Sequence, residues 1–490
     1  MFRQWLTLVI IVLVYIPVAI DATVLHVAAP TLSMTLGASG NELLWIIDIY
    51  SLVMAGMVLP MGALGDRIGF KRLLLLGGGL FGLASLAAAF AHSAGWLIAT
   101  RAVLAIGAAM IVPATLAGIR ATFAEQRHRN MALGVWAAVG SGGAAFGPLV
   151  GGMLLEHFYW GSVFLINVPI VLVVMALTAR LVPRQAGRRD QSLNFGHAIM
   201  LIVAILLLVY SAKTALKGHT ATAAIALTLL TGALLLWQFV RIQLAASRPM
   251  IDMRLFTHRI ILSGVVMAMT AMITLVGFEL LMAQEGLTPY QAGLFMLPVM
   301  LASGFSGPIA GMLVSRLGLR CVATAGMALS AVSFYGLAMT DFSTQQIQAW
   351  ILMALLGFSA ASALLASTAA IMAAAPAEKA AAAGAIETMA YELGAGLGIA
   401  IFGLLLSRSF SASILPPVGL NPKEIERASS SMGEAVQLAH SLPSSLSEAL
   451  LSAAKEAFTW SHSVALSSAG SMLIVLAVGM WFSLAKVQRQ

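Results

Sequence analysis

The chain is dominated by long apolar runs, each long enough to cross a membrane as a helix. About 20 apolar residues span the hydrocarbon core of a bilayer, and fourteen such runs follow one another along the 490 residues. They lie at approximately 5–29, 42–64, 73–92, 97–119, 131–155, 161–180, 194–212, 220–241, 259–283, 290–314, 321–340, 346–372, 382–406 and 464–485. Because backbone polar groups find no partner in lipid, the sequence predicts an all-α polytopic membrane protein with 14 transmembrane helices.

The charged residues support this arrangement of spans, since most bases gather on one side of it. Only 9% of the residues are charged, against roughly 25% in soluble domains. With the N-terminus inside, 20 of the 27 Lys and Arg residues fall in the inner connections, as the positive-inside rule requires. Both termini are therefore predicted to be cytoplasmic. The bases sit in short connections rather than on a soluble module, so no nucleic-acid partner is predicted.

The sequence contains few features that would indicate a cofactor site or an enzyme active site. A single cysteine, Cys321, excludes an intramolecular disulfide and argues against a Cys-based metal site. We find no nucleotide-binding loop, metal-ligand spacing or nucleophile constellation. We therefore predict no metal, no cofactor and no enzymatic activity.

A short charged turn at 62–72 is repeated, in weaker form, at 311–320. The two stretches share two glycines, an arginine and a final base, all at an offset of 249 residues. In an apolar chain such a repeat indicates two related membrane halves. We predict an N-terminal six-helix bundle at 1–182, two additional helices at 190–245 and a C-terminal six-helix bundle at 255–490.

One long connection, at 407–463, is predicted to lie outside the membrane. It is rich in Ser and carries four prolines. Its part at 444–460 begins with a Ser-x-x-Glu pattern and has helical apolar spacing, which favours a short amphipathic surface helix. A flexible loop without a specific role remains the alternative.

Four motifs resemble those of the major facilitator superfamily. The turn at 62–72 is similar to its signature loop between helices 2 and 3, and the stretches 21–30 and 159–169 resemble motifs of the fourteen-helix drug:H⁺ antiporter family. The antiporter motif of fifth helices is matched by Gly134, Gly143, Gly147, Pro148, Gly151 and Gly152. The resemblance covers essentially the whole chain and is strongest to methyl viologen and quaternary ammonium efflux members. It implies the major facilitator fold, with two six-helix bundles and two extra helices between them.

Two departures from the family pattern stand out. His26 occupies a position of the first-helix motif where the family usually has Asn. Between Met282 and Thr288 the chain has fewer residues than the family, which suggests that a loop segment near 284–287 is missing.

Five acidic residues fall in or near the apolar runs, where an unpaired charge costs several kcal/mol. They are Asp21, Asp48, Glu279, Glu387 and Glu392. Burial raises the pKa of a carboxyl group and a neighbouring cation lowers it, so a buried acid can hold a proton when empty and release it when a cationic substrate enters. That competition is a mechanism for antiport, and we predict that these acids bind substrate and couple protons.

Aromatic residues beside two of the acids favour cationic substrates. Trp45 and Tyr50 flank Asp48, and Tyr391 lies one turn beyond Glu387; aromatic faces attract quaternary ammonium groups. The alternative for Asp48 is a paired structural carboxyl. Asp21 has an alternative too, which is that it holds the first helix against the fourth through Arg101. Arg101 resembles the family's fourth-helix arginine, and the resemblance implies that it gives the proton site a switchable partner.

For the other acids the sequence leaves more than one role open. Glu387 and Glu392 are five residues apart and point about 140° from each other on a helix, so they cannot face one small site. Glu392 is either a second coupling site or a packing hydrogen bond. Glu279, near an interface, is either solvated or functional.

The signature turn and the glycines are expected to serve the conformational cycle rather than binding. Gating residues in the turn are Gly62, Asp66, Arg67, Gly69, Lys71 and Arg72. Glycines in the fifth span let helices approach closely, and Pro148 bends the backbone. The second half has a similar set of glycines in the span at 382–406, namely Gly384, Gly394 and Gly398.

Together these features predict a proton-coupled multidrug efflux antiporter of the bacterial inner membrane that works by alternating access. The resemblance implies that its partners are protons and lipophilic cationic small molecules: quaternary ammonium compounds, biguanide antiseptics, viologens and dyes. A divalent substrate favours at least two coupled acids, because exchange of two protons for a dication moves no net charge. We expect a monomer. A proton-coupled transporter of a physiological metabolite is the alternative, and a membrane enzyme is the least favoured.

Overall fold

The computed structural model describes residues 2–182, 194–217, 222–247, 249–250, 253–282, 294–342, 344–374 and 380–485. Within these ranges the chain is helical and contains no strand. Each of the fourteen predicted spans overlaps a helix, so the all-α prediction is confirmed. Among the described residues, eleven helical stretches are long and apolar enough to cross a membrane, and shorter apolar helices lie at Gly196–Leu208 and Leu297–Gly307.

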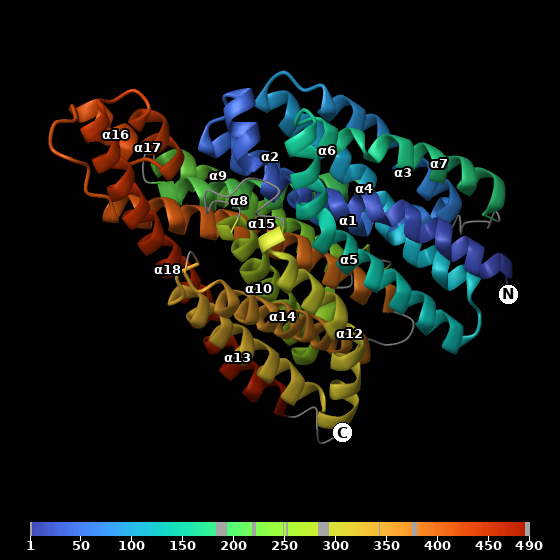
Figure 1. Ribbon diagram of the computed structural model, residues 1–490. Coiled ribbons are helices and arrows are strands. Elements are labelled where there is room, and N and C mark those ends of the chain that lie inside the picture. Colours follow the sequence, from blue (N-terminus) through green and yellow to red (C-terminus); the bar gives the residue numbers. More distant parts are fainter. Residues whose placement is uncertain are drawn as a thin grey trace.

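The helices form two halves (Figure 1), which a two-helix hairpin joins in sequence. The N half contains α1 (Phe2–Leu36), α2 (Gly40–Ile68), α3 (Phe70–Ala89), α4 (Ala94–Thr122), α5 (Gln126–His157), α6 (Ser162–Leu165) and α7 (Asn167–Leu181). The hairpin is α8 (Phe195–Lys217) and α9 (Thr222–Ala245), followed by a 3₁₀ helix at Met253–Thr257. The C half contains α10 (Arg259–Met282), α12 (Leu297–Leu317), α13 (Leu319–Ala338), α14 (Gln346–Ala374), α15 (Ala380–Ser413) and α18 (Ser444–Ser483).

The two halves repeat one packing pattern, and each has its own apolar core. In the N half α1 packs against α5, α4 against α2 and α3, and α3 against α7. In the C half the corresponding pairs are α10 with α15, α14 with α12 and α13, and α13 with α18. Contacts between the halves run along two seams, α2 with α15 and α5 with α12. Two related bundles that meet along two seams can rock against each other.

The repeated turn has the same backbone in both halves. Gly69 has φ +89° and Gly318 has φ +82°, a region that a side chain would strain. Their N–H groups donate to the carbonyls of Gly65 and Val314, which closes α2 and α12 in the same way. The internal repeat inferred from the sequence is therefore a structural repeat. We call this end of the molecule the turn end and the opposite end the loop end.

The loop end differs from the expectation of a long connection at 407–463. α15 continues to Ser413, and 444–460 is helical as expected but forms the first part of α18 rather than a separate surface helix. α18 has 40 residues and so is about 60 Å long, twice the hydrocarbon thickness of about 30 Å. Two short helices, α16 (Pro422–Ala428) and α17 (Met432–Ala439), fold beside it. A small core of Leu420, Ala428, Leu438, Ala439 and Leu450 holds them together.

The start of α2, also at the loop end, is fixed by a reciprocal cap. The amide of Glu42 donates to the Ser39 hydroxyl, and the Ser39 amide donates to the Glu42 carboxylate at 3.0 Å. The hydroxyl of Ser39 also donates to this carboxylate, at 2.7 Å. These hydrogen bonds, the hydroxyl's first, hold the pKa of Glu42 below its usual range. The cap therefore fixes where α2 begins, before its span starts at Trp45.

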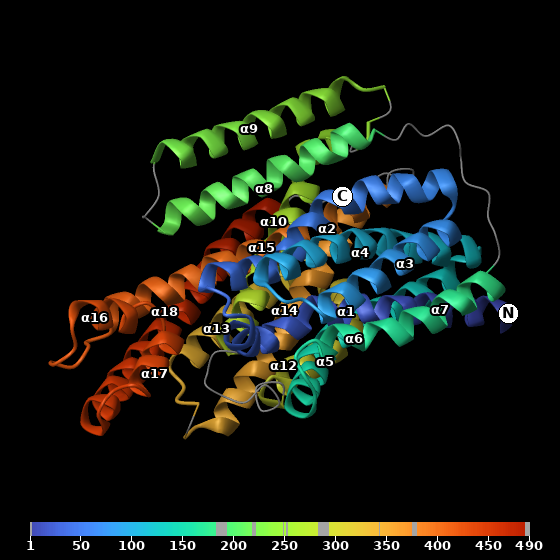
Figure 2. The ribbon, with the colours of Figure 1, turned by 90° about the horizontal axis from the view of Figure 1, so that it is seen from above.

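The α8–α9 hairpin lies along one seam between the halves. α8 packs against α2, α9 and α15 (Figure 2). A cluster of buried apolar residues joins these elements to the C half: Leu52, Val58, Leu59, Leu201, Ile205, Phe239, Ile261 and Ile386. Most of the α9 surface is exposed on the protein, as expected for a helix that faces lipid.

Candidate substrate and proton site

Arg101 is the centre of a buried polar cluster in the N half. Its side chain on α4 is 1% exposed and forms an ion pair with the fully buried Asp21 of α1. The Arg101 Nε donates to the Ile46 carbonyl of α2 at 3.2 Å, and the guanidinium lies 4.5 Å from the centre of the Tyr50 ring. One arginine thus joins three helices, since an arginine can donate in several directions and stack on an aromatic face at once.

The glycines of α5 hold α1, and with it Asp21, in place. A Cβ on Gly147 would lie 2.1 Å from the Thr23 hydroxyl, and one on Gly143 would lie 2.8 Å from the Ala19 Cβ. Gly151 meets Val24 in the same way, at 2.6 Å. Only glycine permits this distance between the helices, as the fifth-span motif predicts. α1 therefore carries Asp21 toward α4 with α5 packed against its neighbouring residues.

The aromatic neighbours of Asp48 have different surroundings. Asp48 is fully buried on α2. Trp45 is partly buried and lies 6.3 Å from the Tyr210 ring of α8, while the face of Tyr50 is occupied by the Arg101 guanidinium. The Arg101 guanidinium thus occupies the face of Tyr50 on which the sequence predicts a substrate cation.

Glu387 is the buried acid of the C half and has two hydroxyl donors. The Tyr391 hydroxyl donates to its carboxylate at 2.6 Å, and the Thr368 hydroxyl of α14 donates to the same oxygen. The two hydroxyl oxygens are 3.1 Å apart. Tyr391 therefore presents its hydroxyl to an acid, in addition to the aromatic face that its sequence position suggests.

Glu392 faces the N half. Glu387 and Glu392 therefore point in different directions, as their spacing on the helix predicts. The Glu392 carboxyl group interacts with the Ser51 hydroxyl of α2 and lies near Tyr15 and Tyr50. One turn further on, a Cβ on Gly396 would lie 3.2 Å from Leu52 of α2. Glu392 is therefore at the α2–α15 seam, while Glu387 is directed within the C half.

The sequence did not single out Thr368, Ser51 or Tyr15. These residues are uncharged, and serine and threonine commonly bond to their own helix backbone in membranes, as Thr368 does with Leu364. Only the positions of neighbouring helices reveal their second partners. Asn167, part of a sequence motif, lies close to Asp21 and donates to Ser85 at 3.4 Å.

Glu279 is apart from these clusters in the fold. It is half-buried near the last residue of α10, at the loop end. The surrounding connection at 283–293, which includes the suspected missing segment, lies outside the described residues. Glu279 therefore lies near the loop end of α10, and its part in binding or proton coupling stays a prediction.

Among the predicted gating residues, Lys71 has the most clearly defined contacts. Its ammonium donates to the carbonyls of Ala179 and Val182, at 2.9 and 2.7 Å, where α7 ends. The repeat residue Arg320 donates to the Trp481 carbonyl at 2.8 Å and stacks 3.7 Å over the Trp481 ring, near the end of α18. Each turn thus ties the last helix of its own half, through a cation at a helix C-terminus.

The other predicted gating and packing residues take less defined positions. Arg67 and Arg72 are exposed, and a Cβ on Gly62 would lie 3.7 Å from the Pro113 side chain of α4. Pro148 and Gly152 are buried within α5. The side chains of Asp66 and His26, and the surroundings of Gly134 and Gly384, lie outside what the structure describes.

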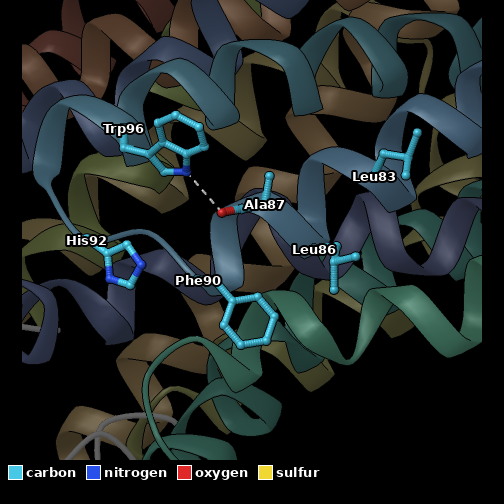
Figure 3. A pocket seen from close by; sticks show the side chains of 6 residues that line it. All are labelled: Leu83, Leu86, Ala87, Phe90, His92 and Trp96. Atoms are coloured by element: carbon cyan, nitrogen blue, oxygen red, sulfur yellow. Dashed lines mark hydrogen bonds between the residues drawn. The ribbon is translucent and has the colours of Figure 1, made fainter.

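A surface pocket at the loop end of α3 and α4 is separate from the acids. Its lining consists of Leu83, Leu86, Ala87, Phe90, His92 and Trp96 (Figure 3). The Trp96 indole donates to the Ala87 carbonyl at 3.2 Å, and a Trp at this level suits a membrane interface. The pocket contains none of the predicted site residues. Among the described residues, no group of three or more His, Cys, Asp and Glu could hold a metal ion.

Two related helix bundles with buried ionisable groups between membrane spans define a secondary membrane transporter. The comparisons agree with this class. The sequence profile of the Major Facilitator Superfamily matches residues 11–399 and 260–489. The chain belongs to this superfamily.

Several known proteins are similar to this chain over most of its length. The methyl viologen resistance protein SmvA of Salmonella typhimurium is 86% identical over 495 residues, with all of both chains covered. The multidrug efflux pump LfrA of Mycolicibacterium smegmatis is 35% identical, over 93% of this chain and 91% of its own. A solved bacterial homologue of the human lysosomal transporter Spinster, inward-facing and unoccupied, has a TM-score of 0.67 at 16% identity, covering 98% of this chain and 96% of its own. That structure supports the fold alone.

Proposed function

We propose that this protein is a proton-coupled efflux antiporter that exports lipophilic mono- and divalent cations across the bacterial inner membrane. The buried ion pair of Asp21 and Arg101 carries the proposal. The 86% identity to a methyl viologen resistance protein and the similarity to a multidrug efflux pump support a cationic drug substrate. α1 begins and α18 ends at the turn end, where Gln4 donates to the Thr122 carbonyl and Arg320 donates to the Trp481 carbonyl. The excess of bases in the connections predicted to be inside supports a cytoplasmic orientation of this end.

The proton and the substrate compete for the same carboxyl groups. A proton on Asp21 removes the charge that Arg101 pairs with, which frees the guanidinium from α1. A cation that enters next to the acids favours their charged forms, so its arrival expels the proton. Export then couples to proton entry because the site holds one or the other.

Acids in both halves fit a site that closes from either side. Asp21 and Asp48 belong to the N half, Glu387 to the C half, and Glu392 to the seam. Exchange of two protons for a dication moves no net charge, whereas one proton for a dication costs about 2.3 kcal/mol per 100 mV for the extra charge. A set of several acids thus suits a transporter that accepts both charge types.

The rocking of the two halves would carry the site from one membrane face to the other. The seams α2–α15 and α5–α12 are the surfaces that must open and close. The turns at the turn end keep each half rigid during this movement, since Lys71 and Arg320 tie α7 and α18 to their own bundles. The chain would act as a monomer, because both halves of the site come from one chain.

Transport measurements in inverted membrane vesicles test the proposal. A fluorescent lipophilic cation is followed under an imposed pH gradient for the wild type, Asp48→Asn and Asp21→Asn. We expect gradient-dependent uptake into the wild-type vesicles, a loss in Asp48→Asn, and no substrate-induced proton release from Asp21→Asn. Uptake that ignores the gradient in the wild type would refute proton coupling, and unchanged uptake in Asp48→Asn would remove that residue from the site.

A further inference from the structure

The two seams between the halves are covered unequally, although the halves themselves are repeats. At the offset of 249 residues, Leu52 and Gly56 of α2 correspond to Leu301 and Phe305 of α12. Leu52 is fully buried, whereas Leu301 is 48% exposed and Phe305 is 72% exposed. This face of α2 is therefore covered at the α2–α15 seam, whereas the equivalent face of α12 is uncovered; in this sense we call the α5–α12 seam the open seam.

The α8–α9 hairpin accounts for the shielding. A Cβ on Gly56 would lie 2.5 Å from the Ile202 side chain and 3.2 Å from its Cα, so the backbone of α8 rests directly on α2. α8 also packs against α15 (Figure 2). Gly56 on α2 permits this close approach. Among the helices that the structure describes, none covers the equivalent position on α12, where Phe305 is exposed.

The open face of α12 adjoins the α5–α12 seam. On α2 the corresponding face reaches the other seam, since Leu52 lies against Gly396 of α15. α12 packs against α5 as α2 packs against α15, so we infer from the repeat that Leu301 and Phe305 border the α5–α12 seam. A Cβ on Gly304, between them, would meet nothing within 4 Å, so this part of the surface has room for a ligand.

We propose that the α8–α9 hairpin seals the α2–α15 seam against lipid, so that cations dissolved in the membrane enter between α5 and α12. This inference rests on the proposed function and concerns the route to its site. The face beside the open seam suits a lipophilic cation: Leu301 and Phe305 offer an apolar and an aromatic surface, and no base lies on α12 before Arg316. A hydrophilic dication does not dissolve in hydrocarbon and must enter from water.

A substitution that fills the open face tests the route. Gly304→Trp adds bulk where the structure has space, and Gly479→Trp is the matched control on α18, where a Cβ also meets nothing within 4 Å. Tetraphenylphosphonium serves as the lipophilic cation and methyl viologen as the hydrophilic one. We expect Gly304→Trp to slow export of tetraphenylphosphonium about tenfold, a barrier increase of about 1.4 kcal/mol, and to leave methyl viologen export unchanged. Gly479→Trp should leave both rates unchanged.

The other outcomes are equally informative. Equal loss of both substrates in Gly304→Trp would overturn the route, since it would show that this face serves the movement of the halves. Unchanged export of both would overturn it as well. A wild-type protein that exports neither cation would instead refute the proposed function.

A second variant tests the seal itself. Gly56→Leu should push α8 away from α2 and open the shielded seam. In the Gly304→Trp background it should restore part of the tetraphenylphosphonium export, while methyl viologen export in the double variant reports that the protein is folded and active. A double variant that exports methyl viologen without any recovery for tetraphenylphosphonium would overturn the sealing role of the hairpin.

Discussion

Lys71 and Arg320 stand 249 residues apart and bind the same part of their respective halves, the carbonyl end of the last helix. Neither contact follows from the turn motif alone, because the partners lie more than 100 residues away in sequence. The pair shows that the repeat extends from the backbone of the turns to their tertiary contacts. It also assigns the turns a mechanical role, since each fixes two helices of one bundle to each other.

Loss of the Lys71 contact should loosen the N half without affecting the site. Lys71→Ala removes both hydrogen bonds to the end of α7, and we expect a loss of about 1 kcal/mol in stability because the contact is partly exposed. Thermal unfolding of the purified protein measures this, and cation affinity should stay near that of the wild type. Arg72→Ala, at an exposed neighbour, is the control. A large loss of cation affinity in Lys71→Ala would contradict the separation of gating from binding.

The Asp21–Arg101 pair should show strong coupling in a double-mutant cycle. Arg101→Gln leaves a buried carboxylate without its cation, which costs about 3–5 kcal/mol. Asp21→Asn in the same chain removes that charge, so the double variant should be more stable than Arg101→Gln alone. Thermal unfolding of the two single variants and the double variant gives the coupling energy. Additive effects would show that the two side chains do not depend on each other.

Tyr391→Phe should weaken the binding of dications more than that of monocations. The Tyr391 hydroxyl donates to Glu387, and its loss removes about 1 kcal/mol of support for the charged carboxylate, or about fivefold in affinity. The binding of a dication depends on more than one charged acid, so its affinity should fall more than that of a monocation. Binding of a mono- and a divalent cation by calorimetry measures the difference. Tyr335→Phe, whose hydroxyl bonds to Ser471 on the other side of the C half, should change neither.

The sequence predicts the features that follow from the chemical type of single residues or from the length of a run. Span positions follow from apolar length, and the turns follow from glycines that alone accept a positive φ. The acids stand out because charge is rare in apolar runs. The many serines at 444–460 favour a separate surface helix in the sequence. In the structure this segment is the first part of α18, because Leu450, Ala454 and Ala457 pack inward.

The features that sequence reasoning missed depend on two helices at once. Nothing in the sequence relates Thr368 to Glu387, or Ser51 to Glu392, since each pair joins separate helices. The same holds for the Arg101 guanidinium on Tyr50. These contacts are set by the crossing of α1, α2 and α4 in one half and of α14 and α15 in the other, and that crossing depends on the packing of many side chains.

The cap at the start of α2 should make a small, pH-dependent contribution to stability. The pKa of Glu42 is lower in the folded protein than its unfolded value of about 4.3. The contribution is therefore present above that value and is lost as the pH falls through the folded pKa. Glu42→Gln retains a residue that can cap but cannot titrate. Unfolding temperatures between neutral and acid pH should fall less steeply for this variant, and parallel curves would contradict the role of the charge.

The glycine contacts between α5 and α1 give a comparison within a single helix. Gly147→Ala places a methyl group 2.1 Å from the Thr23 hydroxyl, so α1 must shift, whereas Gly142→Ala points into open space. Overpacking costs about 1–3 kcal/mol, while alanine in a helix gains up to about 1 kcal/mol over glycine. We therefore expect Gly147→Ala to lower the unfolding temperature and the transport rate, because Asp21 moves with α1, and Gly142→Ala to be neutral or stabilising. Equal behaviour of the two variants would show that α5 does not position α1, and that the antiporter motif acts in some way other than close packing.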